Sequence, residues 1–374
     1  MPDASKGQVE ASSEELPTSP AGLVQLEQRV RWEAHDGQVN VAILEEHGEA
    51  RRAYTGCWDS ASLRCWDLPE VGPPHSTGEL RVGGFLNAVA KLREDVALVA
   101  VSAGLIPTPG ESLKVYDLSP PLPSPKKAKS CFLHTRGCRA LALWPRPGDA
   151  ELAASISKDT LAVSRVRPDG GLQEGPPAFS ASNPHNMQEV MALSWQEEGC
   201  LCSGGTAGTV KAWDLNSTAS GILSSSSVVF IAYIPLERSG PAACARAPGF
   251  DTSRAAPPRV VWWLATPRGS DTNSKADEFA EGRWVDGRTG QPVGHIAGLG
   301  QAYASASITE DLRIVAFGRQ LMALDRRAAA PAPESAATLD AAALSLSLQS
   351  CGKSMQSMLV GSKDGAARLY AVHA

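Results

Sequence analysis

The stretch YTGCWD at residues 54–59, followed at once by LRCWDL at residues 63–68, decides the fold because a second copy exists. Residues 203–206 read SGGT and lead into TVKAWDL at residues 209–215, with the same order of small residues, turn and alternating strand. Worn copies read LKVYDL at 113–118, RWVDGRTG at 283–290, LMALD at 321–325 and GSKDG leading into RLY at 361–370. Repetition at a fixed period is the sequence signature of a repeat architecture.

The repeats have a regular period. Strand ends near residues 67, 117, 166, 214, 286, 325 and 371 leave gaps of 50, 49, 48, 72, 39 and 46 residues. These residues resemble the WD40 repeat family, whose undecorated repeat spans about 40–45 residues and ends near a Trp-Asp dipeptide. The long gap is a repeat with two insertions rich in Ser, Pro, Gly and charge. The resemblance implies an all-β, seven-bladed WD40-like β-propeller formed as one domain by residues 22–374.

Strand patterns and the two chain ends agree with this architecture. Short apolar or alternating runs at residues 39–43, 96–101 and 314–317 are typical of strands. With 34 Gly and 27 Pro in 374 residues, long helices are disfavoured. The last repeat stops at its third strand, whereas residues 23–30 form a predicted strand before the first repeat opens. We therefore expect this N-terminal strand to dock as the outer strand of the last blade and close the ring.

The resemblance also implies a buried hydrogen-bond relay in the well-kept blades. In the first blade the matching residues are His35, Thr55, Asp59 and Trp66, and one extra residue between Thr55 and Trp66 displaces Asp59 from the pattern. The fourth blade keeps His185, Ser203 and Trp213.

Other relay positions depart from the repeat pattern. Ala207 stands at the Asp position of the fourth blade, so its relay is expected to be incomplete. The last blade keeps Asp364 but has Val360 at the hydroxyl position. His134 opens a blade in the same way as the other two histidines, and we interpret all three as structural residues.

Composition bounds the compartment and the partners. Residues 1–21 are polar, acidic and free of aromatics, which predicts a disordered tail without the apolar core of a signal peptide. No run approaches the roughly 18 apolar residues that a membrane span needs. Eight cysteines without a CxxC pair indicate small buried residues in a reducing compartment, so we expect the cytoplasm, the nucleus or both. A net charge of −5 disfavours nucleic-acid binding.

One basic cluster, residues 126–129, follows a proline-rich stretch at 119–125. It is either a solvated, extended connector between outer strands or a regulatory loop. Ser124 opens the sequence SPKK, which resembles the Ser-Pro-x-Lys sites of cyclin-dependent kinases. Phosphate there would add roughly −1.5 to −2 charge beside three lysines. The same stretch can pass as a weak nuclear-import signal.

No catalytic constellation is found in the sequence. Residues 204–211 read GGTAGTVK, which predicts a turn between two short strands and not a phosphate-binding loop. The acidic pair at residues 45–46 is expected at a solvated turn. No cofactor, metal or small-molecule substrate is expected.

Because fold alone does not imply function, the functional hypothesis depends on the resemblance. It implies a non-catalytic scaffold that binds other proteins or peptides, as a subunit or adaptor of a larger complex. In the family, partners dock on the top face, formed by the loops leading into each blade and the turns between its second and third strands. The matching contacts are Trp58, Lys158 and Lys363 from such turns and Arg136 from a loop.

Two alternatives stay open. A substrate receptor of a cullin-type ubiquitin ligase is one, since residues 286–288 and 325–327 retain Asp-x-Arg, although Val285 and Leu324 replace the preceding Trp. The other is an enzyme or small-molecule binder that uses the central channel.

Overall fold

The computed structural model describes residues 24–47, 50–102, 112–119, 129–131, 133–145, 148–187, 190–197, 199–205, 210–215, 220–224, 230–234, 260–265, 281–286, 292–296, 302–309, 312–325, 334–351 and 355–373. Within these ranges every regular element is a β-strand, and no helix occurs. The expectation of an all-β protein is confirmed. The tail expected at residues 1–21 lies outside the described residues.

The strands of the described residues form seven four-stranded antiparallel sheets, and six of them use four consecutive strands. The first sheet contains β2 (Val39–His47), β3 (Ala50–Cys57), β4 (Ser62–Asp67) and β5 (His75–Arg81). The second contains β6 (Phe85–Arg93), β7 (Val96–Ser102), β8 (Leu113–Asp117) and β9 (Lys129–Ser130). The third contains β10 (Ala140–Trp144), β11 (Leu152–Ile156), β12 (Thr160–Arg165) and β13 (Phe179–Ser182).

The next three sheets repeat this order. The fourth contains β14 (Val190–Glu197), β15 (Cys200–Gly205), β16 (Val210–Asp214) and β17 (Ser220–Ser224). The fifth contains β18 (Phe230–Ile234), β19 (Val260–Ala265), β20 (Glu281–Asp286) and β21 (Pro292–Ile296). The sixth contains β22 (Ala302–Ser307), β23 (Leu312–Phe317), β24 (Gln320–Asp325) and β25 (Glu334–Thr338).

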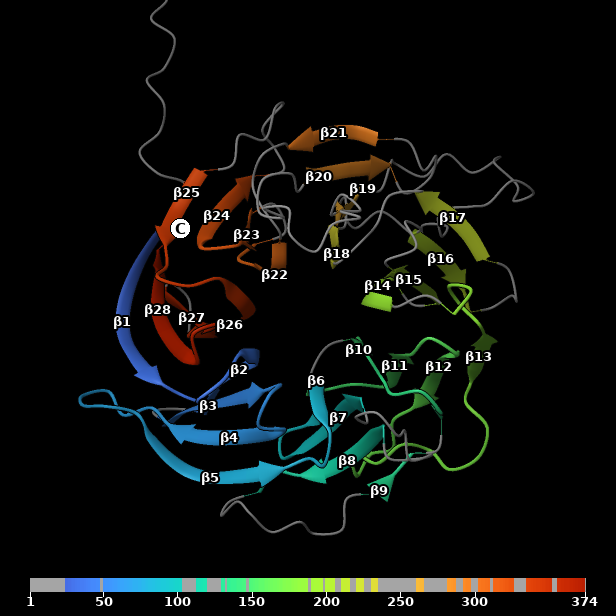
Figure 1. The fold of residues 1–374 in the computed structure, drawn as a ribbon, viewed down its shortest axis with the longest axis horizontal. Coiled ribbons are helices and arrows are strands. Elements are labelled where there is room, and N and C mark those ends of the chain that lie inside the picture. Colours follow the sequence, from blue (N-terminus) through green and yellow to red (C-terminus); the bar gives the residue numbers. More distant parts are fainter. Residues whose placement is uncertain are drawn as a thin grey trace, which may run out of the picture.

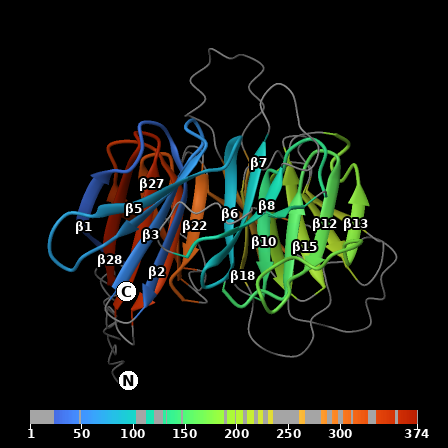
Figure 2. The same cartoon turned by 90° about the horizontal axis from the view of Figure 1, so that it is seen from below.

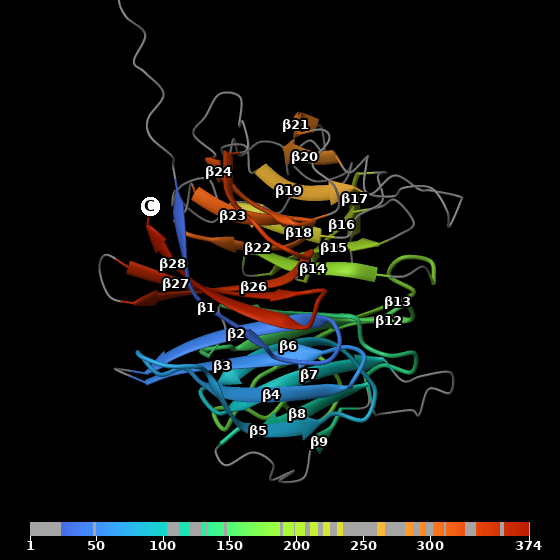
Figure 3. The ribbon, with the colours of Figure 1, turned by 60° about the vertical axis from the view of Figure 1, so that its left-hand side comes forward.

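The remaining sheet joins the two ends of the chain. It has the order β1-β28-β27-β26, with β26 (Ala343–Cys351), β27 (Met355–Ser362), β28 (Ala366–His373) and β1 (Gln25–Glu33). β1 lies antiparallel to β28, from Gln25 opposite His373 to Glu33 opposite Ala366. Figure 3 shows the blue N-terminal strand alongside the red C-terminal strand.

The sheets are arranged around a common centre (Figure 1). The first strand of each of the first six sheets, and β26 of the last, faces this centre, and the other strands follow outward. Seen from the side, neighbouring sheets stand next to each other with their strands steeply inclined (Figure 2). The third strands end at Asp67, Asp117, Arg165, Asp214, Asp286 and Asp325, at or next to the positions that the repeat spacing predicts.

Among the residues whose side chains are described, the hydrophobic core lies between neighbouring sheets, because strands such as β7 are apolar on both faces. In β7, Ala97, Val99 and Val101 belong to the core shared with the first sheet. The alternate residues Leu98 and Ala100 belong to the core shared with the third sheet. Successive side chains of a strand point to opposite faces, so a strand buried on both faces is a continuous apolar run.

β1 contributes to one of these cores. Trp32 is 9% exposed and lies edge-on to Trp66 of the first sheet, with the ring centroids 5.9 Å apart. Both rings pack in the cluster that joins the last sheet to the first. β1 therefore holds its own sheet through the backbone and the next sheet through Trp32.

Removal of β1 is the first test. We expect deletion of residues 1–23 to leave the melting temperature nearly unchanged, whereas deletion of residues 1–33 should lower it strongly. Trp32→Ala alone should lower the free energy of unfolding by about 3–5 kcal/mol, the usual effect of truncating a buried Trp. Thermal melts followed by circular dichroism provide the measurement. Equal stability of the two truncated chains would contradict the role of β1.

Candidate functional site

The top face is formed by two kinds of connection. The loops leading into the sheets contribute residues 34–38, 82–84, 133–139, 183–187 and 340–342, and the turns between second and third strands contribute residues 58–61, 157–159 and 363–365. Strand direction places all of these segments at the same end of their sheets. The structure thus brings together loops that are far apart in the sequence.

A buried relay fixes the loop in front of the first sheet. His35 Nε2 lies 3.0 Å from Thr55 Oγ1, which accepts a hydrogen bond of 2.8 Å from Trp66 Nε1. His35 is 4% exposed and Thr55 is fully buried. The loop, the second strand and the third strand are therefore held by one hydroxyl, as the repeat pattern predicts.

The fourth sheet repeats this relay. His185 Nε2 lies 2.7 Å from Ser203 Oγ, which accepts a 2.8 Å hydrogen bond from Trp213 Nε1. Ala207 lies outside the described residues. These three residues are hydrogen-bonded to one another as the repeat pattern predicts.

The third sheet carries a relay that the sequence analysis missed. His134 Nε2 lies 2.8 Å from Ser155 Oγ, and its Nδ1 lies 3.2 Å from Ser157 Oγ. Ser157 in turn donates to Asp159, which also accepts hydrogen bonds from the backbone and hydroxyl of Thr135. Ser164 and Arg165 stand where Trp and Asp would be, so no Trp-Asp signal marked this blade. The spacing of Ser155 to Asp159 matches that of Thr55 to Asp59 and could have revealed it.

Asp59 does not join the relay of the first sheet. Its Oδ2 accepts a 3.0 Å hydrogen bond from the backbone N of Gln38, and His35 Nδ1 is buried without a hydrogen-bond partner. The prediction of Asp59 as a relay member is therefore wrong. The extra residue in this turn is the physical reason: Ala61 adopts φ +52°, which lengthens the turn and carries the carboxylate away from the ring.

In the last sheet an arginine replaces the histidine relay. Arg368 is 1% exposed, and its guanidinium donates to Ser362 Oγ and, at 3.0 Å, to Asp364 Oδ2. Ser362 also donates to Asp364 Oδ1 at 2.7 Å, so the hydroxyl comes from Ser362 while Val360 lies in the core. Burial acts to raise the pKa of Asp364, but hydrogen bonds from Ser362 and Arg368 outweigh it and hold this pKa well below its usual range.

The three relay histidines are held neutral. Burial lowers the pKa of His35, His134 and His185 to about 4 in each case. A solvated histidine has a pKa of about 6.5. As the pH falls, the histidines of the unfolded chain are therefore protonated before those of the folded chain. Stability supplied by the neutral histidines is present above pH 6.5 and is lost as the pH falls toward 4.

We expect the free energy of unfolding to fall between pH 7.5 and pH 5 by of the order of 1–2 kcal/mol for each relay histidine. Urea unfolding at both pH values measures this fall. The His185→Gln chain should be less stable at pH 7.5 but show a shallower pH dependence. The control is His75→Gln, because the His75 side chain is 64% exposed. An unchanged pH dependence in His185→Gln would contradict the assignment.

The structure places the four predicted contact residues on the top face with different exposure. Arg136 and Lys363 are exposed, whereas Lys158 is half-buried. Trp58 is also half-buried, because its ring stacks on Phe85 of the second sheet with the centroids 4.2 Å apart. Trp58 thus spans the junction of two sheets, which the repeat pattern by itself did not predict.

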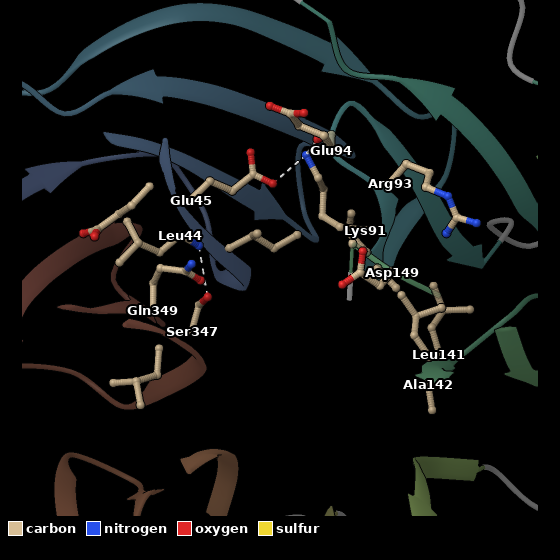
Figure 4. Close-up of a pocket in the computed structure, with 17 residues that line it drawn as sticks. Leu44, Glu45, Lys91, Arg93, Glu94, Leu141, Ala142, Asp149, Ser347 and Gln349 are labelled. Atoms are coloured by element: carbon tan, nitrogen blue, oxygen red, sulfur yellow. Dashed lines mark hydrogen bonds and ion pairs between the residues drawn. The ribbon is translucent and has the colours of Figure 1, made fainter. Parts of the chain in front are cut away.

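A cavity of about 750 Å³ opens at the common centre of the sheets, lined by inner strands of the first, second, third and last sheets. Figure 4 shows its charged wall, where Lys91 points to Glu45. Lys91 Nζ lies 2.6 Å from Glu45 Oε1, donates to the carbonyl of Glu94 and sits 4.9 Å from the centroid of the Tyr54 ring. The side chain of Lys91 is only 5% exposed.

Two features of this wall correct the sequence interpretation. Glu45 and Glu46 lie within β2 and not at a turn, and their side chains are 14% and 10% exposed. Arg93 donates to the carbonyls of Leu92, Ala150, Arg167 and Pro168, which ties β6 to the third sheet. The cations in the wall therefore hold protein groups.

Breaking the cavity pair is the next test. We expect Lys91→Met to cost about 3–5 kcal/mol, because it leaves Glu45 as a nearly buried charge without its cation. The double variant Lys91→Met, Glu45→Leu should recover part of this loss. As a control, Arg29→Met removes an exposed pair with Glu27 and should change stability by less than about 1 kcal/mol. Urea unfolding gives all three values, and equal effects of Lys91→Met and Arg29→Met would contradict a structural role of Lys91.

Five cysteines of the described residues are free thiols: Cys57, Cys65, Cys131, Cys138 and Cys202. Burial raises the pKa of the Cys138 thiol to about 12. Cys200 is disulfide-bonded, which differs from the expectation that all eight cysteines are reduced.

Several predicted features lie outside the described residues. They include Ser124, residues 126–128 of its basic cluster, and both Asp-x-Arg sequences beyond Asp286 and Asp325. Among the described residues no group of His, Cys, Asp and Glu is arranged to hold a metal ion, and none of their elements is a helix long and apolar enough to cross a membrane.

Comparisons with known proteins agree with the geometry of the fold. Protein-family models and curated proteins yielded no match. A chain of the crystal structure of the mitotic checkpoint complex superposes with a TM-score of 0.62 at 14% identity, covering 99% of this chain and 100% of that chain. The crystal structure of the WD40 β-propeller domain of Doa1 gives 0.61 at 14% identity, covering 92% and 96%.

These likenesses define the class of protein. The fold is that of the WD40 β-propellers, which confirms the resemblance of the repeats. At 14% identity the likeness shows the fold alone.

Proposed function

We propose that this protein is a non-catalytic scaffold that binds other proteins or peptides through its top face, as a subunit or adaptor of a larger complex in the cytoplasm or nucleus. The observation that carries the proposal is the way the top-face loops are held. Buried relays at His35, His134 and His185 tie each loop to the second strand of its sheet. Loops positioned by a rigid scaffold are where binding residues concentrate.

The presented side chains fit a protein contact. Trp58 offers a ring supported by Phe85, and Arg136 and Lys363 are exposed around the same face. Trp and Arg are the side chains that most often dominate binding energy in protein interfaces. Half-buried Lys158 completes the set of four.

The central cavity supports the enzyme hypothesis less well. Its wall uses Lys91 to hold Glu45 and Arg93 to hold four carbonyl groups. The neutral histidines lie in the relays, where the Nε2 of each ring meets a hydroxyl group. A channel that binds a small molecule remains the second candidate, because the cavity has the volume of a ligand site.

We also propose that residues 22–374 act as one seven-bladed ring closed by β1, with residues 1–21 as a tail and Ser124 as a regulatory site. Support for closure comes from the pairing of β1 with β28 and from the contact of Trp32 with Trp66. A ring joined at its ends would keep the top-face loops at fixed mutual positions.

The proposal is tested by affinity purification from cells followed by mass spectrometry. The chain with Trp58→Ala, Arg136→Glu, Lys158→Glu and Lys363→Glu should fold and lose its protein partners, since charge reversal opposes docking. Folding is checked by the melting temperature.

A matched control carries Val71→Ala and Arg165→Glu. Val71 is exposed in the connection between β4 and β5 and Arg165 at the end of β12, both opposite the top face, so these changes should retain every partner. Retention of all partners by the top-face variant would overturn the assignment of this face. Loss of partners by both chains in equal measure would do so as well.

A further inference from the structure

We propose that the top face across the first three sheets binds an acidic peptide segment of a protein partner, with a bulky apolar side chain of that segment seated on the Trp58–Phe85 pair. This inference rests on the proposed scaffold function and names the chemistry of the partner. Three observations support it: a pair of stacked aromatic rings, an excess of positive charge near these rings, and contacts between sheets that join the rings and the basic residues into one surface.

The aromatic anchor comes from two sheets. The Trp58 and Phe85 rings lie 15° from parallel with their centroids 4.2 Å apart, and both residues stay half-exposed. Trp58 is positioned by its backbone N, which donates to the carbonyl of Gln38 at 3.3 Å. Two rings already stacked on each other lose little side-chain freedom when a third apolar group packs on them.

Basic residues continue from this anchor across the second sheet. Gly83, at φ +74°, is exposed beside Phe85, and a side chain built there would find Lys114 Nζ 4.0 Å away. Arg81 is exposed at the end of β5. Lys114 thus lies beside the loop between β5 and β6, and Arg81 lies at the start of that loop.

Contacts between sheets carry this surface on to the third sheet. Asn87 Nδ2 donates to the carbonyl of Cys138 at 2.7 Å, and Arg139 Nη1 donates to Asn87 Oδ1 at 3.3 Å. Exposed Arg136 belongs to the same loop as Cys138 and Arg139. The backbone N of Thr135 in this loop donates a hydrogen bond to Asp159, which follows Lys158 in the sequence. Aromatic and basic groups therefore form one connected surface.

The balance of charge on this surface is opposite to that of the whole chain. Apart from the ion pair of Arg64 with Glu79, five cations of the described residues in this sector stand against three anions: Arg81, Lys114, Arg136, Arg139 and Lys158 against Asp36, Asp59 and Asp159. The chain as a whole carries a net charge of −5. A local positive sign on an acidic protein favours an acidic partner and speeds its encounter.

Two of the three anions are occupied by the fold. Asp59 accepts from the backbone of Gln38. Burial acts to raise the pKa of Asp159, but hydrogen bonds from Ser157 and Thr135 outweigh it and lower this pKa. These carboxylates shape their turns, and the exposed side chains of Arg81 and Arg136 supply positive charge for the partner.

The test is selection of peptides from a displayed library of random 12-residue sequences on the immobilised full-length chain. We expect enriched peptides to carry at least about two net negative charges and one bulky apolar residue. The most enriched peptide, labelled with fluorescein, is then titrated by fluorescence anisotropy. Trp58→Ala and the pair Lys114→Glu, Arg136→Glu should each raise its Kd by about tenfold or more.

Matched controls separate charge from packing. Arg136→Gln should weaken binding less than Arg136→Glu, and Arg165→Glu on the opposite face should have no effect. Raising the salt from about 50 mM to about 300 mM should weaken the peptide, because exposed charges are screened. A single-stranded oligonucleotide of 12 nucleotides is titrated in parallel, and it should bind more weakly than the peptide.

Enriched peptides that are neutral or basic, or no enrichment over the uncoated support, would overturn the inference. An oligonucleotide that binds as tightly as the peptide and depends on the same cations would overturn it too. These outcomes differ from failure of the scaffold proposal, in which cellular partners persist after substitution of the top face.

Discussion

A four-stranded sheet with two apolar faces cannot cover either face by itself, and every other feature of this protein depends on how that constraint is met. In β7 the odd-numbered residues pack toward the first sheet and the even-numbered residues toward the third. Burial of apolar surface is the main favourable term in folding. Each sheet therefore needs a neighbour on both sides, and sheets placed around a centre supply one.

That arrangement buries polar groups at the top of the junctions between sheets, where loops lead into the strands. Backbone and side-chain groups brought there from water need partners, since an unpaired buried polar group costs about 1–3 kcal/mol. The relays meet this need with one hydroxyl that serves a loop histidine and an inward tryptophan. The third sheet uses two serines, and the last sheet uses Arg368 with Ser362 and Asp364. The chemistry varies, but each solution holds its loop or turn to a strand.

The proposed function depends on which polar side chains the fold uses for its own stability and which it leaves accessible. At the centre of the sheets, Lys91 forms an ion pair with Glu45, and Arg93 donates hydrogen bonds to backbone carbonyls of the third sheet. Their charges therefore stabilise the junctions between sheets. On the top face, the relays fix the backbone, and the side chains of Trp58 and Arg136 extend beyond it. The proposed contact surface is what remains after the fold has used the polar groups that it needs.

The sequence by itself determined the class of fold, the ends of the third strands and the relays built on His35 and His185, while His134 was assigned only a structural role. These features repeat at a fixed spacing, and repetition can be read without knowing which segments meet. Only the tertiary structure decided that Glu45 pairs with Lys91, that Trp58 stacks on Phe85 and that Asp59 leaves its relay. The two pairs join residues of different sheets, and local sequence carries no signal for a partner across such a junction. The displacement of Asp59 depends on one residue with positive φ, which no alternation of polar and apolar residues encodes.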